Sequence, residues 1–248
     1  SKALDDAELR VYYDNESTVN YLKFKIYNSF GEDITRTFKS LDVTDQSATP
    51  GGTLYSDDRC KVVSPIFAQY PVTVEYSYQV KDVVLFSYPS WVPVTSTNMA
   101  LQQASYTLRT PKSRTPRMKS VNKVPEVSMS SEKEINQYKW EISNFTAIET
   151  EPFSPPYYEL IPFLLLAPDY INYNTYSNTF ASWNDFGKFL SYLVNGRDQL
   201  ATETVVKLQA LVKDCADNKS KIKAVYKYMQ QRTRYVGVQI GIGGWQPT

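Results

Sequence analysis

The chain has 248 residues, of which 42% are hydrophobic, and a formal net charge of +1. This composition can bury a core, so intrinsic disorder is not expected, and the length suits one large domain or two smaller ones. The near-zero charge gives no electrostatic reason to expect nucleic acid or an anionic membrane as a partner.

The first 150 residues show the period of two that is typical of half-buried strands. Apolar and polar side chains alternate over Leu22–Ile26, Val72–Val80 and Tyr138–Ile142. Turn-forming residues stand between such runs, at Asn28–Gly31 and Thr49–Gly52. Several short antiparallel strands joined by polar turns predict a β-sandwich over residues 1–150.

Residues 151–176 are rich in proline, which prevents a helix and disfavours a central strand. The prolines are Pro152, Pro155, Pro156, Pro162 and Pro168. We therefore expect an extended, semi-rigid linker that is packed onto the surface of its neighbours.

The period of a helix begins after this segment. Ser182 is a plausible N-cap with Asp185 three residues later, and Asn195-Gly196 ends the first helix. A second helix is expected near Thr202 and a third near Ser220. The predicted inward residues are Trp183, Phe186, Phe189, Leu190 and Leu193, then Val205, Leu208, Leu211, Val212 and Cys215, then Ile222, Val225, Tyr226 and Met229.

The last elements are a predicted strand over 235–240 and a glycine turn over 241–244. A single buried strand cannot satisfy its own backbone hydrogen bonds. Residues 177–248 are therefore expected to be the incomplete N-terminal part of a domain.

Three segments together resemble a known family. They are YSDDRCKV to YPVTVEYSY (Tyr55–Tyr78) with PSWVPV (Pro89–Val94), KWEISNFTAIETEPFSPP (Lys139–Pro156), and MQQRTRYVGVQIGIGGWQP (Met229–Pro247). The first two resemble the DUF3857 domain, found in bacterial proteins, many of them from Bacteroidetes. The third resembles the entry to the transglutaminase-like, papain-like domain that follows DUF3857 in such proteins.

The resemblance implies an α+β protein whose β-sandwich precedes an incomplete transglutaminase-like domain. It also implies a downstream Gly-Asp-Cys motif, and a Cys-His-Asp triad beyond Thr248 that would carry out acyl transfer or amide hydrolysis. A protein or peptide substrate and an exported, periplasmic or cell-surface location follow from the same resemblance.

No catalytic residue is expected within these 248 residues, because the sequence has no histidine. Trp245 and Gln246 precede the expected cysteine and are candidates for donors to an oxyanion or for cleft residues. The alternative is that Trp245 anchors the turn and Gln246 is solvated. No cofactor or metal site is expected.

The two cysteines, Cys60 and Cys215, are too few and too far apart for a metal pattern. Two free thiols are expected rather than one long-range disulfide. Cys215 ends an apolar helical face, and Cys60 stands between Arg59 and Lys61, which could lower the pKa of its thiol. For both cysteines we favour a structural role.

Three other features have a functional and a structural interpretation. Twenty tyrosines, with Trp91 and Trp140, could form an aromatic platform for a glycan or a peptide, although tyrosine also suits pleated surfaces. The pair Asp57 and Asp58 beside Arg59 is expected to be a surface turn with an ion pair rather than an acid–base site. The basic residues Lys112, Arg114, Arg117, Lys119 and Lys123 are expected to lie on a solvated loop or edge strand.

Two functions are consistent with these observations. The first is the non-catalytic N-terminal region of a transglutaminase-like cysteine protease or amidase, which positions the substrate or the catalytic domain. The second is an exported glycan- or peptide-binding β-sandwich without enzymatic activity. No apolar run reaches the ~20 residues that a transmembrane helix needs, and the sequence does not specify an oligomeric state.

Overall fold

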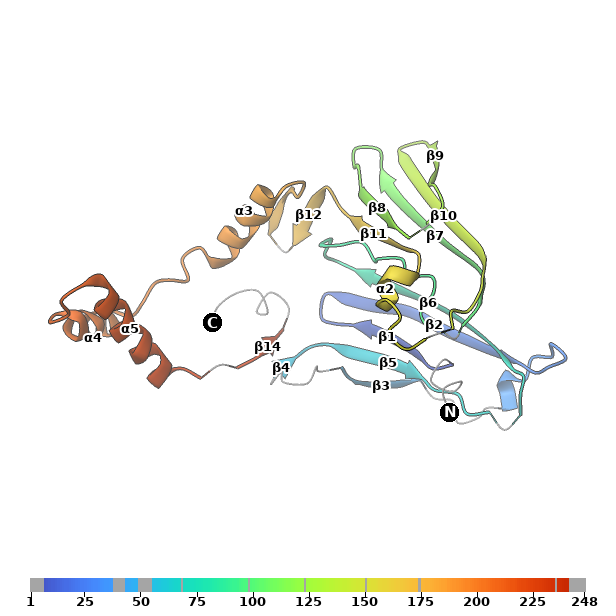
Figure 1. Ribbon diagram of the computed structural model, residues 1–248, viewed down its shortest axis with the longest axis horizontal. Helices are drawn as coiled ribbons and strands as arrows, with labels where there is room; N and C mark the ends of the chain where they lie inside the picture. The colour runs from blue at the N-terminus through green and yellow to red at the C-terminus, as the bar shows by residue number, and fades with distance from the viewer. Residues whose placement is uncertain are drawn as a thin grey trace. The chain divides into compact units, whose positions relative to one another are not determined.

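The computed structural model describes residues 7–37, 43–48, 55–67, 69–97, 99–122, 124–149, 151–173, 175–234 and 236–240 (Figure 1). The chain divides into two compact units, residues 1–83 with 190–248, and residues 84–189. Most of the regular structure consists of antiparallel strands, with a few helices, in agreement with the predicted α+β class. The stacking of the strands as a sandwich stays a prediction, as do the domain boundaries 1–150, 151–176 and 177–248.

The described residues of the first unit form three groups of strands. The antiparallel sheet β1-β5-β3 is formed by Leu9–Tyr13, Arg59–Val63 and Thr44–Ser47. The long strands β2 (Ser17–Tyr27) and β6 (Thr73–Asp82) pair antiparallel, and the short strands β4 (Tyr55–Ser56) and β14 (Val238–Gln239) pair parallel. A 3-10 helix, η1, covers Thr35–Thr37.

The β2-β6 pair follows directly from the alternating sequence. Phe24 lies opposite Tyr76 and Ile26 lies opposite Val74, and the Ile26 side chain is fully buried. The turn that follows β2 depends on Asn28 and Gly31. The amide of Gly31 donates to the carbonyl of Asn28 at 3.0 Å, and Gly31 has a φ of +79°, a backbone conformation that only glycine adopts without strain. The predicted turn at Asn28–Gly31 is therefore confirmed, whereas Thr49–Gly52 lies outside the described residues.

Among its described residues, the second unit contains three small antiparallel sheets. The sheet β7-β10-β9 is formed by Leu101–Pro111, Ile135–Phe145 and Ser128–Glu132. The strands β8 (Arg117–Val121) and β11 (Phe163–Ala167) form a pair, and β12 (Tyr170–Tyr173) and β13 (Tyr176–Thr179) form another. The short helix α2 (Tyr157–Leu160) precedes β11.

A hydrophobic core fills the second unit. Its buried members are Trp91, Leu108, Tyr138, Trp140, Leu164 and Leu166. The alternation along β10 places Tyr138 and Trp140 on this side, with the Trp140 side chain 2% exposed. Packing these large side chains together removes a large apolar area from water, which is the main stabilising term of the unit.

Residues 151–176 do not form the extended linker that we expected. They contain α2, β11, β12 and the first residue of β13, and they contribute Leu164 and Leu166 to the core. The prolines permit this because they lie at element boundaries, as Pro156 does before α2 and Pro162 before β11. A missing N–H is tolerated at such positions, so regular strands fit between the prolines.

The three predicted helices are present as α3 (Trp183–Val194), α4 (Thr202–Val212) and α5 (Asn218–Arg232). The α3 N-terminus has the expected cap, since the Asp185 amide donates to Ser182 Oγ at 3.2 Å and the Ser182 amide donates to Asp185 Oδ2 at 3.1 Å. Asp217 and Ser220 form a capping box for α5, which therefore begins slightly earlier than predicted. None of these helices is long and apolar enough to span a membrane.

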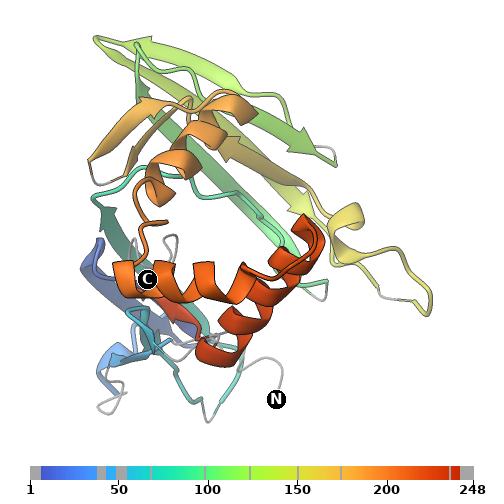
Figure 2. The ribbon, with the colours of Figure 1, turned by 90° about the vertical axis from the view of Figure 1, so that its left-hand side faces the viewer.

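The predicted inward faces are only partly buried. On α3, Phe189 and Leu193 are buried, whereas Trp183 is 87% exposed. The helices α4 and α5 contact each other (Figure 2), but neither contains a buried residue. Their apolar side chains, for example Ile222 at 69% exposed, are therefore not covered by the described residues.

The strand predicted over 235–240 is shorter than expected and is paired. β14 covers only Val238–Gln239, and the amide of Tyr55 on β4 donates to the carbonyl of Gly237 at 3.3 Å. The expectation that this strand lacks a partner is therefore wrong. The turn over 241–244 lies outside the described residues, as do the candidate site residues Trp245 and Gln246.

Candidate functional site

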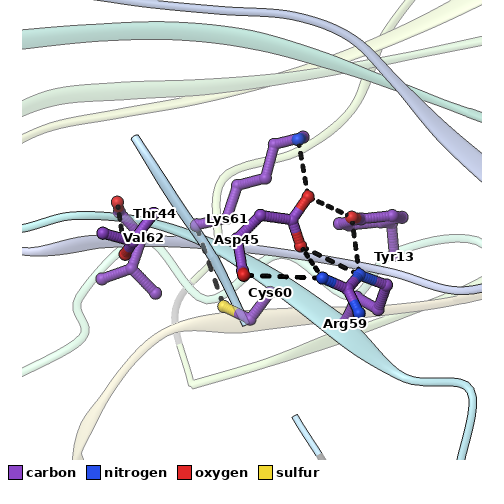
Figure 3. Close-up of polar contacts among 7 residues, drawn as sticks. All are labelled: Tyr13, Thr44, Asp45, Arg59, Cys60, Lys61 and Val62. Carbon is purple, nitrogen blue, oxygen red and sulfur yellow. Dashed lines mark hydrogen bonds and ion pairs between the residues drawn. The ribbon is translucent and has the colours of Figure 1, made fainter. Parts of the chain in front are cut away.

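The most connected polar cluster of the first unit lies on the sheet β1-β5-β3, around Asp45 (Figure 3). Asp45 Oδ1 accepts a hydrogen bond from Arg59 Nε at 2.9 Å and lies 2.8 Å from Arg59 Nη2 in an ion pair. Asp45 Oδ2 accepts from Lys61 Nζ at 2.9 Å and from the Tyr13 hydroxyl at 2.5 Å. The four side chains come from three strands, which the sheet register brings together.

These contacts determine the charge state of the cluster. The hydrogen bond from Tyr13, followed by those from Lys61 and Arg59, holds the pKa of Asp45 well below its usual range. Both carboxylate oxygens already accept from strong donors, and the carboxylate stays ionised. Asp45 is therefore unsuited to general acid–base catalysis. Its role is to tie β3, whose residues are all exposed, to the neighbouring strands.

Among the described residues, Arg59 forms no ion pair with its neighbour Asp58, contrary to our expectation for this turn. Arg59 pairs instead with Asp45, which the register of β3 and β5 places beside it. The Asp58 backbone amide donates to Ser56 Oγ at 3.1 Å, as expected for a turn. A local sequence pattern gives no sign of the partner, because the ion pair joins two strands that are not consecutive.

A group of carboxylates that the sequence pattern did not indicate surrounds the turn between β1 and β2. Burial, followed by the charges of Asp14 and Asp57, raises the pKa of Glu16. Burial and the charge of Asp14 also raise the pKa of Asp82, which lies opposite Ser17 in the β2-β6 register. Among the described residues, no group of three or more acidic or cysteine side chains is arranged to hold a metal ion.

The two thiols are free, and their surroundings favour structural roles. Cys60 on β5 is 1% exposed, and burial raises the pKa of its thiol. Arg59 and Lys61, which could have lowered this pKa, do not do so, because successive residues of a strand point to opposite faces. Cys215 follows α4, is half-buried, and donates its amide to the carbonyl of Val212 at 3.1 Å.

The two tryptophans that could have belonged to an aromatic platform are buried, in agreement with the structural interpretation that the sequence also allowed. Trp91 and Trp140 are 8% and 2% exposed and belong to the core of the second unit. Among the described tryptophans, Trp183 is the exposed one. Alternation placed Trp140 correctly on a strand, but the face it occupies depends on residues far away in the sequence.

The predicted basic segment lies in the connection between β7 and β8 and on the strand β8. Lys112, Arg117 and Lys119 are exposed, in agreement with the predicted solvated segment, whereas Lys123 lies outside the described residues. The Arg114 guanidinium lies 3.9 Å from the centre of the Tyr170 ring, a cation–π contact. Arg117 donates to backbone carbonyls, including that of Phe180 at 2.7 Å.

The antiparallel sheets and the few helices define a β-rich α+β protein. A family model for a domain of unknown function with a solved structure, DUF3857, matches residues 1–149. The chain belongs to the DUF3857 family. This confirms the family that the sequence motifs indicated.

A solved structure extends the comparison beyond residue 149. The chain is similar to a putative protease from Parabacteroides distasonis ATCC 8503, with a TM-score of 0.65 and 14% sequence identity. The match covers 99% of this chain and 47% of that chain, so the present chain spans about half the length of that protein. At this identity the similarity establishes a shared fold. No match was found among curated proteins.

Proposed function

We propose that this chain is the non-catalytic N-terminal region of a transglutaminase-like cysteine protease or amidase. In this proposal the DUF3857 part and the helices after it position the substrate or the catalytic domain. The thiol nucleophile, its histidine and its aspartate lie downstream of Thr248. The protein is exported or periplasmic, and its substrate is a protein or a peptide.

The observation that carries the proposal is the shared fold with the Parabacteroides distasonis protein. Nearly all of this chain matches about half of a protein that is described as a putative protease. The absence of histidine from the sequence is consistent with this division, because a Cys-His-Asp mechanism then needs residues from outside these 248. The burial of Cys60 gives further support. Its thiol is buried and has a raised pKa, so this cysteine has a structural role and is not the nucleophile.

The helices α4 and α5 support a role in positioning a catalytic domain. They contain no buried residues, and Ile222, Tyr226 and Met229 on α5 are 69%, 56% and 45% exposed. A contiguous set of exposed apolar side chains is typical of a surface that another part of a protein covers. The sandwich architecture and the transglutaminase-like start of these helices are part of the proposal.

The test uses the full-length gene product. Amide hydrolysis should be measured with the cysteine of the expected Gly-Asp-Cys motif intact and replaced by alanine. We expect a loss of about 10³-fold or more on replacement, as for other nucleophiles that act within a triad. Activity that survives the replacement, or a reading frame without this cysteine and a histidine, contradicts the thiol mechanism.

The alternative is an exported glycan- or peptide-binding module without enzymatic activity. The burial of Trp91 and Trp140 removes two residues of the platform on which a glycan would stack. Binding of the isolated chain to neutral oligosaccharides, in the absence of any thiol-dependent hydrolysis by the full-length protein, would favour this alternative.

A further inference from the structure

One surface of the second unit is hollowed beside the exposed tryptophan. The hollow is lined by Arg117, Phe180, Ala181, Ser182, Trp183 and Phe186. The Trp183 ring meets Phe186 edge-on, with ring centres 5.9 Å apart, and Phe186 meets Phe180 in the same manner at 5.9 Å. The indole is thus supported by aromatic neighbours while remaining 87% exposed. Such a ring offers a large apolar surface to a ligand at a small cost in side-chain entropy.

A fixed positive charge lies in the same hollow. Arg117 Nη2 donates to the carbonyls of Phe180 at 2.7 Å and Pro168 at 3.2 Å, which hold the guanidinium in place. Within the described part of the chain, no carboxylate forms an ion pair with Arg117. The nearby Asp185 accepts from the backbone amides of Ala181 and Ser182, and it pairs with Lys188 at 3.6 Å.

A second hollow begins at Arg117 and continues along β8 and β11. It is lined by Arg117, Met118, Lys119, Leu165, Leu166 and Ala167. The register places Lys119 opposite Leu165 and Arg117 opposite Ala167. Leu165 is 44% exposed, and no described acidic side chain forms an ion pair with Lys119. The two hollows share Arg117, and we treat them together as one strip that has apolar side chains along it and two cations without an ion pair to a described carboxylate.

We propose that the strip formed by Arg117, Lys119, Leu165, Trp183 and Phe186 binds an extended acidic peptide that carries an aromatic or large aliphatic side chain. The apolar side chain would cover Trp183 and Phe186, and carboxylates of the peptide would pair with Arg117 and Lys119. Charge complementarity favours an anionic partner, because neither cation forms an ion pair with a carboxylate of the described residues. This inference goes beyond the proposed function, because binding requires no thiol and no triad.

The composition of the strip favours a peptide over an acidic oligosaccharide. The side chains of Leu165, Met118 and Ala167 offer no hydrogen bonds to sugar hydroxyls, whereas they can pack against apolar side chains of a peptide. An apolar floor beside isolated cations suits alternating apolar and acidic side chains. A purely structural interpretation is that the cations protect an edge strand from aggregation. That interpretation predicts no preference for acidic peptides.

The test measures fluorescence anisotropy of labelled decapeptides with the chain of residues 1–248. The first peptide has two glutamates flanking a phenylalanine, the second has glutamines in their place, and the third has alanine for phenylalanine. We expect the first to bind about tenfold or more tightly than either of the others, and its affinity to fall with added salt. Equal affinities, or no binding up to about 1 mM peptide, would overturn the proposal.

Variants locate the binding to the strip. Trp183→Ala and Lys119→Gln should each weaken binding of the glutamate peptide by about fivefold to tenfold. Phe153→Ala is the matched control, because Phe153 is also a fully exposed aromatic residue of the second unit but does not line the strip. Thermal unfolding should show that Lys119→Gln leaves the fold intact. Unchanged affinity of both variants, equal loss with Phe153→Ala, or tighter binding of an oligogalacturonate would overturn the peptide assignment.

Discussion

Trp91 and Leu164 exchange a pair of backbone hydrogen bonds. The Trp91 amide donates to the Leu164 carbonyl at 3.0 Å, and the Leu164 amide donates back at 2.9 Å. Leu164 also lies opposite Ser120 in the register of β11 and β8, and its side chain is fully buried in the core of the second unit. This residue from the proline-rich segment therefore joins the segment around Trp91 to the strand β8.

Replacing Leu164 by alanine should destabilise the second unit strongly. The change removes buried apolar atoms and leaves a cavity, which costs about 2–5 kcal/mol in well-packed cores. The free energy of unfolding can be measured in urea, with Trp91 and Trp140 fluorescence as the signal. The matched control is Leu165→Ala, because Leu165 is adjacent and 44% exposed. Equal losses for the two variants would contradict the assigned core.

Replacing Tyr13 by phenylalanine should raise the pKa of Asp45. The hydrogen bond from Tyr13 is the largest contribution to the lowered pKa, and the change leaves the partners Arg59 and Lys61 in place. The pKa can be followed by NMR titration of the Asp45 carboxylate carbon in the two proteins. An unchanged titration would contradict the geometry around Asp45.

The same cluster predicts how stability depends on pH. The folded pKa of Asp45 is below the ordinary value of 3.8, so its stabilisation is present above that pH and is lost as the pH falls through the folded pKa. Asp45→Asn should therefore lower the urea midpoint at pH 7, and the difference should shrink as the pH falls below about 4. A difference that is the same at pH 7 and pH 3 would show that the carboxylate charge is not responsible.

Replacing Glu16 by glutamine should have the opposite effect. Its folded pKa is above the ordinary value of 4.5, so the ionised side chain destabilises the folded state once the pH rises above 4.5. We expect Glu16→Gln to stabilise the protein at pH 7 by a few tenths of a kcal/mol, after allowance for solvent screening. The gain should fall by about half or more near pH 4. At that pH the Glu16 carboxyl is largely protonated in the unfolded chain as well. The exposed residue Glu134 provides the control Glu134→Gln, which should change little at either pH.

Replacing Ser182 by alanine should weaken the N-terminus of α3. Ser182 Oγ accepts from the Asp185 amide at 3.2 Å, and the loss of such a cap costs about 0.5–2 kcal/mol. The control is Ser191→Ala, which lies within the same helix and at an exposed position, where alanine is the better helix former. Urea denaturation followed by circular dichroism compares the two variants, and equal effects would contradict the capping role.

The features that were predicted correctly are those whose cause is local in the sequence. The alternation at Leu22–Ile26 and Tyr138–Ile142 is enough to predict β2 and β10, because side chains of a strand point alternately to its two faces. The cap at Ser182 is a pattern of four residues, which leads directly to the start of α3. The motifs that resembled DUF3857 were likewise sufficient to identify the family over residues 1–149.

Tertiary structure decided the features that depend on distant partners. Prolines in residues 151–176 suggested a linker, but β11 forms there because β8 and the segment around Trp91 supply its hydrogen bonds. The partner of Arg59 is Asp45 rather than its neighbour Asp58, and Trp91 and Trp140 are core residues rather than a binding platform. Local patterns in the sequence were enough for the strands and helices marked by a clear period or cap, such as β2, β10 and α3, and for the family. Which side chains meet was decided by strand register and packing, because these join residues that no local pattern connects.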